Sequence, residues 1–358
     1  MVYVIKTFQF VGYIVLSDHI LVISPKIPKI SFINMIRYAL SLEYNWESYS
    51  SLDKEENYYD LLVLIFLQEL NKIIQKGLLK GYQTIEENKT FVKGKILFKE
   101  NLSMNFNRPD KIYCTFDELS TDILENRIIK YVLQNLSQCY FKDVKINSEL
   151  FQLNGYLNEI TLQPFTKEII NLIEYTPNNQ HYKIILSLCE LFLESFSVEQ
   201  RFGERSINSF LINMNALFEK FVVSVLKNSP FDLEIQEQKR EFADLFRQLE
   251  FKFDIVVSIK GKSILILDTK YKEYKNKPDS SDLEQLIAYS TISGIGNCGL
   301  IYPGKDIRPY FQIKQNINLY IILIDLEAKN SKEFEEKINI FRTSLYQLTI
   351  IPAFKKLL

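Results

Sequence analysis

Histidine and cysteine are scarce in this chain of 358 residues. The two histidines, His19 and His181, leave little material for a histidine-based metal site, an HNH-type nuclease or a Ser-His-Asp triad. The four cysteines are Cys114, Cys139, Cys189 and Cys298. No two of them are close enough in sequence for a CxxC-type metal pair. We therefore expect no structural zinc site, and we interpret both histidines as structural or surface residues.

Long apolar runs and an excess of one charge are also missing. The richest apolar run, Leu61 to Leu67, ends at Gln68 and Glu69, and the N-terminal residues lack the pattern of a signal peptide. The 43 Lys and Arg against 44 Asp and Glu leave a net charge of −1. Any contact with DNA must therefore come from a local basic face. We expect a soluble cytoplasmic protein without membrane contact.

The residues that are present suit packed cores, because 47% are hydrophobic and 13% aromatic. With only 11 Gly and 10 Pro, the chain has no flexible linker that would mark a boundary. A change of pattern predicts two regions, a β-rich and helical one over 1–205 and an α/β one over 206–358. The expected fold class is therefore mixed, α+β in the first region and α/β in the second.

The first region alternates strand and helix patterns. The first thirty residues resemble a small β unit, and periodic apolar positions predict helices over 34–42 and 58–76. The segments YQTIEE, KTFVKGKILF and KIYCTF predict three strands between about residues 81 and 116. An amphipathic helix follows over 120–136, with Ser120, Thr121 and Asp122 as candidate caps, and then two more helices to about residue 197. We leave open whether Glu118, Asn126 and Arg127 are structural or contact a partner.

In the second region, a helix over 207–228 is expected to precede three strands, a helix, two strands and a final helix. Two β-type runs, FDIVVSI and SILILDTKY, are joined by a tight turn at Lys260, Gly261 and Lys262, which predicts a hairpin. Period-two alternation points Asp268 and Lys270 to one face, and the hairpin brings Asp254 beside Asp268. Two carboxylates and an ammonium are thus predicted to converge.

This grouping indicates a specific chemistry. Two carboxylates suit a hard cation such as Mg²⁺, which can polarise a phosphodiester and activate water, while Lys270 orients or deprotonates the attacking water. A solvated hairpin with scattered charges is the alternative for a bare D-x-K triplet. Three features favour a site: the strand SILILD is apolar on both faces, Gln285 and Tyr289 lie four apart on one helix face, and Glu219 lies within an otherwise apolar helix. Candidate DNA contacts near the triplet are Tyr271, Lys272, Lys275 and Tyr289.

Together, Glu219, Asp254, Asp268-Thr269-Lys270 and Gln285-x-x-x-Tyr289 resemble the PD-(D/E)XK nuclease superfamily. More narrowly, the chain resembles the McrC family, the nuclease subunits of McrBC-type modification-dependent restriction systems. The resemblance covers nearly the whole chain, including GKILFKENLSMNFNRPDKIYCTFDELSTDILENRIIKYVL and FLINMNALFEKFV. The chain departs from the family at Phe253, which stands where proline usually precedes the first aspartate.

The resemblance implies a restriction endonuclease-like domain at the C-terminus that cleaves DNA with Mg²⁺, for which Mn²⁺ can substitute. Asp254, Asp268 and Glu219 would bind the metal. Lys270 would be the catalytic lysine, and Gln285 would orient that lysine or the scissile phosphate. The N-terminal region would dock on McrB, a hexameric AAA+ GTPase, and would stimulate its GTP hydrolysis. McrB would recognise the modified base, of the 5-methylcytosine type, in double-stranded DNA.

We expect this chain itself to bind no nucleotide. Gly261, Lys262 and Ser263 lack the upstream glycine of a Walker A motif, and the GxGxxG at residues 294–299 follows a helix and precedes a strand, the reverse of the dinucleotide-binding order. Two other hypotheses stay open. In the first, the protein is a stand-alone nuclease of a repair or defence system. In the second, it is mainly a structural activator of an AAA+ motor.

Overall fold

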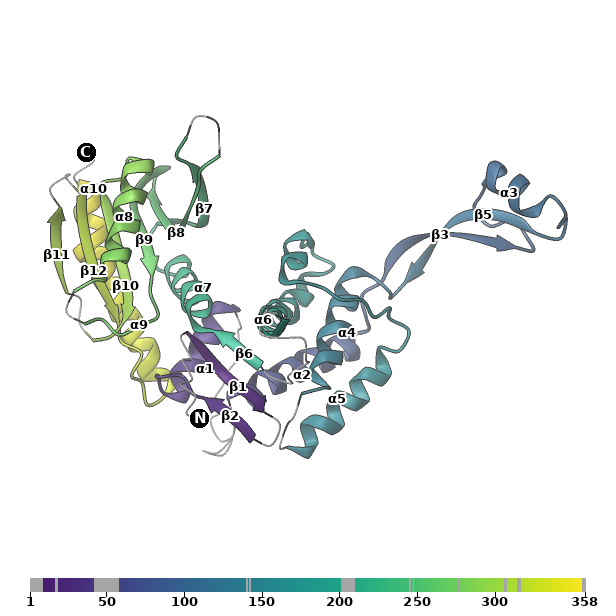
Figure 1. Cartoon of the computed structure of the whole chain (residues 1–358), viewed down its shortest axis with the longest axis horizontal. Coiled ribbons are helices and arrows are strands. Elements are labelled where there is room, and N and C mark those ends of the chain that lie inside the picture. Colours follow the sequence, from purple (N-terminus) through teal and green to yellow (C-terminus); the bar gives the residue numbers. More distant parts are fainter. Residues whose placement is uncertain are drawn as a thin grey trace, which may run out of the picture. The chain divides into compact units, whose positions relative to one another are not determined.

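The structure is a computed structural model of the whole chain (Figure 1). It describes residues 9–16, 19–41, 58–139, 141, 143–200, 210–244, 246, 248–275, 277–305, 308–313 and 317–355. The chain divides into two compact units, which do not follow the order of the sequence. Residues 1–58 and 209–358 form one, here called the split unit, and residues 59–208 form the other, here called the inserted unit. The cut at Ser209 is near the expected change of pattern at residue 205, whereas residues 1–58 group with the C-terminal part.

A six-stranded mixed sheet forms the centre of the split unit, in the order β11-β12-β10-β9-β8-β7. Its strands are β7 (Glu234–Phe242), β8 (Glu250–Ile259), β9 (Lys262–Thr269), β10 (Asn297–Pro303), β11 (Arg308–Ile313) and β12 (Ile317–Ile324). Strands β9, β10 and β12 are parallel to one another, and the other pairs are antiparallel. The sheet has one strand more than the sequence pattern predicts after the helix over 280–293.

The predicted hairpin is present between β8 and β9. Ile259 pairs with Lys262, so Lys260 and Gly261 form a two-residue loop, and both have positive φ, 50° and 72°. This conformation is the one that matches the twist of the flanking strands. From Ile264 onward every residue of β9 is buried, which confirms the expected central, covered strand.

Helices cover this sheet: α7 (Met214–Lys227), α8 (Ser280–Ser293), α9 (Ser331–Leu345) and α10 (Ile351–Lys355), with a π-helical turn over Tyr346–Ile350. Leu286 and Tyr289 of α8 pack in a buried cluster with residues of β8, β9, β10 and β12. The N-terminal helix α1 (Lys29–Ala39) packs against α7 and α9. There Tyr38 contacts Phe221 edge-on at 5.8 Å, and its hydroxyl donates to Glu335.

A separate three-stranded sheet joins the two sequence segments of the split unit. Its order is β2-β1-β6, from β1 (Phe10–Leu16), β2 (His19–Ile23) and β6 (Phe210–Asn213), all antiparallel. The predicted β unit in the first thirty residues is thus confirmed, and its partner strand β6 leads directly into α7.

The inserted unit contains a helical body and a projecting β arm. The body consists of α2 (Tyr58–Lys76), α4 (Leu124–Leu136), α5 (Val144–Tyr156), α6 (Lys183–Gln200) and two 3₁₀ turns, Lys167–Leu172 and Gln180–Tyr182. The arm, in the order β3-β5-β4, consists of β3 (Gly81–Lys89), β4 (Lys95–Ile96), α3 (Phe98–Asn105) and β5 (Ile112–Ser120). Figure 1 shows it extending away from the helices of its own unit.

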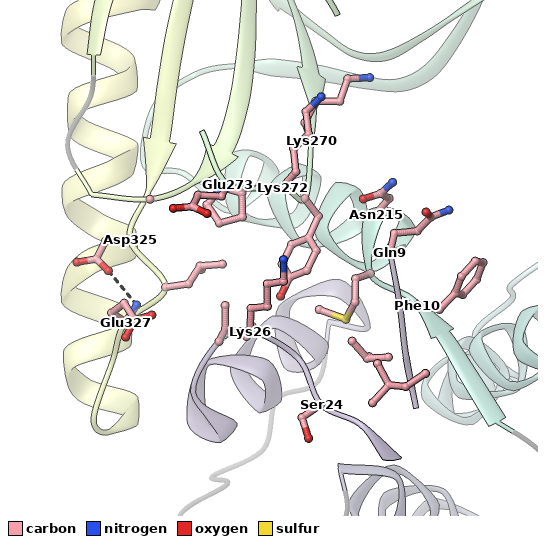
Figure 2. A pocket seen from close by; sticks show the side chains of 18 of the residues that line it. Gln9, Phe10, Ser24, Lys26, Asn215, Lys270, Lys272, Glu273, Asp325 and Glu327 are labelled. Atoms are coloured by element: carbon pink, nitrogen blue, oxygen red, sulfur yellow. Dashed lines mark hydrogen bonds between the residues drawn. The ribbon is translucent and has the colours of Figure 1, made fainter. Parts of the chain in front are cut away.

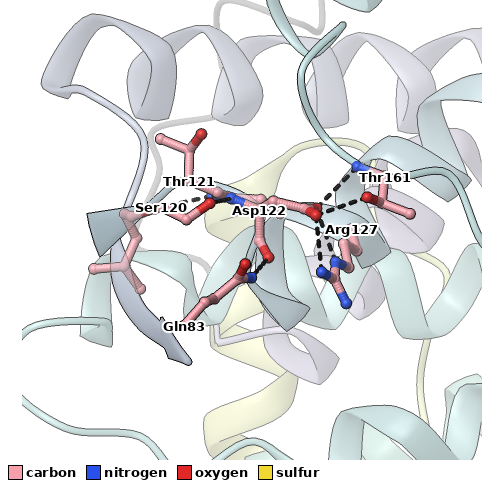
Figure 3. Close-up of polar contacts among 8 residues, drawn as sticks. Gln83, Ser120, Thr121, Asp122, Arg127 and Thr161 are labelled. Carbon is pink, nitrogen blue, oxygen red and sulfur yellow. Dashed lines mark hydrogen bonds and ion pairs between the residues drawn. The ribbon is translucent and has the colours of Figure 1, made fainter. Parts of the chain in front are cut away.

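Asp122 fixes the root of the arm (Figure 3). Its carboxylate accepts hydrogen bonds from Arg127 at 2.8 Å and from the backbone and hydroxyl of Thr161 at 2.8 and 2.6 Å. The Arg127 guanidinium holds the pKa of this carboxyl well below its usual range. Gln83 of β3 donates to the Asp122 carbonyl oxygen. Asp122 and Arg127 thus have a structural role, tying β3 to α4 and to the segment at Thr161.

Three predicted elements are wrong in their bounds. In the predicted strand over 89–98, Lys89 ends β3, only Lys95–Ile96 form a strand of their own, β4, and Phe98 begins helix α3. The helix predicted over 207–228 starts at Met214, because residues 210–213 pair with β1 and the Asn213 side chain caps the helix. Helix α4 starts at Leu124 after Ile123, so none of the candidate residues 120–122 is its cap.

Candidate active site

Two aspartates lie side by side where β8 and β9 end their pairing. Ile255 is opposite Leu267, so Asp254 and Asp268 are the next positions on the two strands. The backbone N–H of Thr269 donates to Oδ2 of Asp254 at 3.1 Å. The hairpin therefore brings the two carboxylates together, as the sequence predicts.

Lys270 continues from β9 and joins the aspartates to α8. Its Nζ lies 2.9 Å from Oδ2 of Asp268 and donates to Oε1 of Gln285 at 3.0 Å. The amide of Gln285 in turn donates to the hydroxyl of Tyr289 at 2.6 Å, which fixes the orientation of the Gln285 carbonyl toward the lysine. The Asp268 side chain is only 1% exposed and that of Lys270 21%, so this chain of contacts lies at the rim of the core.

Burial and mutual repulsion govern the electrostatics of the two carboxyls. Burial, together with the nearby charge of Asp254, raises the pKa of Asp268 to about 7. Burial also raises the pKa of Asp254. Burial alone would lower the pKa of Lys270, but the charge and hydrogen bond of Asp268, with the charges of Asp282 and Asp254, together outweigh it, so the pKa of Lys270 is raised and the ammonium is retained. Two acidic groups in this position favour a proton or a cation between them.

The aspartates fit a magnesium ion. Oδ1 of Asp268 is buried, and none of the described residues donates a hydrogen bond to it. Within the described part of the chain, no three His, Cys, Asp or Glu side chains are grouped closely enough to form a metal cluster. Mg²⁺ does not require such a cluster, because it commonly uses one or two protein carboxylates and keeps several waters. Asp254 and Asp268 would supply those carboxylates.

Glu219 approaches the aspartates from α7. It is partly buried, and the side-chain amide of Gln238 on β7 donates to its Oε1. Burial, with a further contribution from Asp254, raises the pKa of Glu219 to about 7. Its carboxylate is therefore within electrostatic reach of Asp254, while a role as metal ligand stays a prediction.

The four candidate DNA contacts occupy different environments. Lys272 forms ion pairs with Asp279 and with the buried Asp282, at 2.7 Å to the latter, which ties the segment after β9 to the start of α8. Tyr271 packs against Phe218 of α7, with ring centroids 5.7 Å apart. Tyr289 is buried, so its ring offers no face to a base and its hydroxyl serves to orient Gln285. Lys275 is exposed.

Phe253, which replaces the usual proline, is fully buried and packs edge-on against Tyr289 at 4.8 Å. It anchors β8 to α8 one residue before Asp254. Sequence reasoning did not single out Gln238 or Lys252. Period-two alternation from Asp254 would have placed Lys252 on the same face, whereas Gln238 becomes visible only from the pairing of β7 with β8.

A cavity of about 670 Å³ lies beside the segment that follows β9. Figure 2 shows the side chains around it, which come from the N-terminal segment, the start of α7 and the carboxyl ends of β9, β10 and β12. Lys26 and Gln9 contribute from the N-terminal segment and Asn215 from α7, so residues far apart in sequence meet beside Lys270.

Comparisons with known proteins agree with this architecture. The chain is 24% identical over 287 residues to the type IV methyl-directed restriction enzyme EcoKMcrBC of Escherichia coli strain K12, which covers 73% of this chain and 81% of that relative. The fold of the present chain is similar to that of a chain in a solved structure, the refined half-complex from a tetradecameric assembly of Thermococcus gammatolerans McrB AAA+ hexamers with bound McrC. The TM-score is 0.57 at 21% identity, covering 95% of this chain and 83% of that one. No described helix is long and apolar enough to cross a membrane. The model of the McrBC 5-methylcytosine restriction system component family matches residues 5–303, and the chain belongs to that family.

Proposed function

We propose that this chain is the DNA endonuclease subunit of a modification-dependent restriction system, with a PD-(D/E)XK catalytic domain in the split unit. The observation that carries the proposal is the convergence of Asp254, Asp268, Lys270 and Gln285 at the end of one hairpin. In a solvated hairpin with scattered charges, we would not expect an aspartate that is only 1% exposed to contact a lysine that also donates a hydrogen bond to a third side chain.

Each residue has a distinct task in phosphodiester hydrolysis. Asp254 and Asp268 would hold Mg²⁺, and the ion, when bound, polarises the phosphodiester and lowers the pKa of water. Lys270 keeps its proton beside Asp268, so it can donate to a phosphate oxygen and offset negative charge as it develops. Gln285, locked by Tyr289, keeps the lysine in place.

The inserted unit supports docking on a partner. The end of its arm carries six apolar side chains that are each more than half exposed: Phe91, Val92, Phe98, Leu102, Met104 and Phe106. Clusters of exposed apolar residues on a soluble protein indicate an interaction site. The solved assembly with a similar fold is titled as McrB AAA+ hexamers with bound McrC. We therefore propose that the arm binds an McrB-like AAA+ GTPase and stimulates its GTP hydrolysis.

Recognition of the modified base would then belong to the partner. The whole chain has a net charge of −1, which does not favour autonomous binding to DNA at high affinity. The name of the family specifies 5-methylcytosine, and we propose double-stranded DNA with this modification as the substrate. Cleavage by this chain would follow recruitment by the GTPase.

The test is cleavage of methylated and unmethylated plasmid with Mg²⁺, with and without the AAA+ protein and GTP. Asp268→Ala should abolish cleavage, by at least about a thousandfold, because it removes a metal-binding carboxylate, while stimulation of GTP hydrolysis stays intact. Asp232→Ala, which removes an exposed carboxylate from the same unit, serves as the matched control and should cut like wild type.

Other outcomes separate the alternatives. Cutting without the partner would favour a stand-alone nuclease. Faster GTP hydrolysis without any cutting would leave only a structural activator. Loss of both activities in Asp268→Ala, with Asp232→Ala unaffected, would indicate misfolding of the variant, which its thermal unfolding would reveal. Full cleavage by Asp268→Ala would disprove the assigned site.

A further inference from the structure

The β7–β8 hairpin continues beyond the rest of the sheet at the catalytic end. Strand β9 pairs with β8 only as far as Ile255, while β7 pairs with β8 out to Phe242 and Glu250. Residues 238–242 and 250–254 therefore form a two-stranded ribbon that starts at Asp254 and leads away from it. Figure 1 shows β7 and the start of β8 projecting past the neighbouring strands.

The ribbon has a packed base, and the residues described near its tip are hydrogen-bonded to one another. At its base, Phe251 and Phe253 pack edge-on against Tyr289, with ring centroids 6.4 and 4.8 Å apart. In the loop, the carboxylate of Asp244 accepts three backbone N–H groups, those of Phe246, Gln248 and Leu249, at 3.1, 2.7 and 2.7 Å. These bonds tie the Asp244 side chain to the backbone of the residues that follow it, as in an Asx turn.

Two cations lie on the catalytic face of the ribbon. Arg240 of β7 lies opposite Lys252 of β8. Lys252 is two residues before Asp254, so the two residues lie about 7 Å apart along the strand on the same face. Both side chains are exposed, and alternation along β8 places Lys252 on the face of Asp254, where its positive charge acts to lower the pKa of Asp254 and of Glu219. The ion pair of Arg240 with Glu250 is long, at 3.4 Å, and exposed, so it exchanges readily for another anion.

Beyond the cations, the ribbon ends in apolar side chains. Phe246 is 83% exposed, Leu249 60% and Phe242 43%. Moving outward from the aspartates, the ribbon therefore presents first the positive charges of Lys252 and Arg240 and then the exposed aromatic ring of Phe246. A two-stranded β-ribbon is one of the elements that fit a groove of B-DNA, and apolar side chains at such tips pack against bases.

We propose that the β7–β8 ribbon enters a groove of the DNA beside the scissile phosphate, with Arg240 and Lys252 on backbone phosphates and Phe246 against the bases. The inference rests on the proposed nuclease function and specifies how that site holds its substrate. It assigns DNA contact to β7 and β8, whereas the sequence pointed to the segment after β9. Lys272 of that segment is engaged with Asp279 and Asp282.

The test uses the full chain assembled with its AAA+ partner, GTP and Mg²⁺. Single-turnover cleavage of methylated duplex below saturation is measured over a range of salt concentrations. Arg240→Ala and Lys252→Ala should each slow cleavage by about tenfold and reduce the slope of log rate against log salt by about one, because each removes one phosphate contact. Phe246→Ala should slow cleavage by a similar factor of about ten without changing that slope.

Matched controls come from α9, where Lys332→Ala removes an exposed charge and Ile340→Ala an exposed apolar side chain. Both should cut like wild type. Arg240→Lys and Lys252→Arg keep the charge and should keep the salt slope, which a purely structural effect on the ribbon would not explain.

Three results would overturn the inference or its basis. Wild-type rates and slopes in Arg240→Ala, Lys252→Ala and Phe246→Ala, while Asp268→Ala abolishes cleavage, would refute the ribbon alone. Loss of stimulated GTP hydrolysis in the ribbon variants would make the ribbon a protein contact instead. Full cleavage by Asp268→Ala would refute the proposed function itself.

Discussion

At the scale of single residues, the raised pKa of Glu219 has a measurable consequence for stability. Its value of about 7 compares with 4.5 for an ordinary glutamate, so between these values the folded state binds more protons than the unfolded state. Stability without divalent ions should therefore fall as pH rises through this window. Glu219→Gln removes the titrating group and should stabilise the protein by about 1 to 3 kcal/mol at pH 8, and by less at pH 5.

Urea unfolding followed by circular dichroism at both pH values measures this difference. Glu284→Gln, which neutralises an exposed carboxylate on α8, is the control and should show no gain at either pH. An equal gain of Glu219→Gln at pH 5 and pH 8 would contradict the assigned cause, because only a group that titrates in this window can produce the difference.

Residue-scale contacts differ in how far the sequence predicts them. Alternation along β9 was enough to place Asp268 and Lys270 on one face, and the tight turn was enough to return Asp254 to them. The donor to Glu219 could not be predicted, because Gln238 reaches it only through the pairing of β7 with β8 and the packing of α7 near that edge. Such contacts depend on tertiary geometry that no local pattern contains.

At the scale of elements, the arm depends on one glycine. Gly94 has φ of +70°, and a Cβ there would lie 2.3 Å from the carbonyl oxygen of Thr115 and 2.7 Å from Cβ of Phe116. Gly94→Ala should destabilise the arm by about 2 to 4 kcal/mol, because the backbone is left-handed and β5 cannot move away without losing its pairing. Stimulation of GTP hydrolysis by the partner should fall accordingly.

Hydrogen exchange of the arm and the partner's GTPase rate are the measurements. Gly155→Ala, in α5, is the control, because a Cβ there meets nothing within 4 Å and alanine favours a helix. Unchanged exchange protection of β4 and β5 in Gly94→Ala would show that the arm tolerates the strain.

The arm also contains the element that the sequence pattern missed. No element is predicted between the strands expected over 89–98 and 111–116, because the apolar side chains at this end of the arm are exposed and no core selects one periodicity over another. Side-chain bonds decide the structure instead: Asn105 donates to Asn101 one helical turn earlier, and Asn101 accepts the backbone N–H of Tyr113. Helix α3 is therefore held by polar contacts that hydrophobic periodicity does not report.

At the scale of the whole molecule, the N-terminal segment belongs to the unit that carries the candidate active site. Strand β1 pairs with β6, and on α1 the Arg37 guanidinium and the Tyr38 hydroxyl bind Glu335 of α9. The pattern change near residue 205 could not reveal this, because hydrophobic periodicity describes neighbours in sequence and says nothing of contacts such as that of Tyr38 with Glu335, 297 residues apart. Residues 206–358 therefore include only part of this compact unit.

This arrangement predicts different outcomes for two deletions. Gly81 pairs with Ser120, so an Asn-Gly turn can replace residues 82–119 and close the arm at its root. The armless chain should keep the unfolding temperature of the split unit, and lose stimulation of the GTPase together with the cleavage that depends on this partner. A fragment of residues 206–358 should fail to unfold cooperatively, because it exposes the faces of β6, α7 and α9 that β1 and α1 cover in the full chain.

Calorimetry of both proteins beside wild type, with circular dichroism of the fragment, measures these outcomes. Adding a peptide of residues 1–41 to the fragment is the sharpest control, because recovery of a cooperative transition requires the missing strand and helix to dock. A fragment that unfolds cooperatively by itself would show that the N-terminal segment is dispensable to the candidate nuclease domain. Failure of the armless chain to keep its transition would show instead that the arm stabilises more than its own unit.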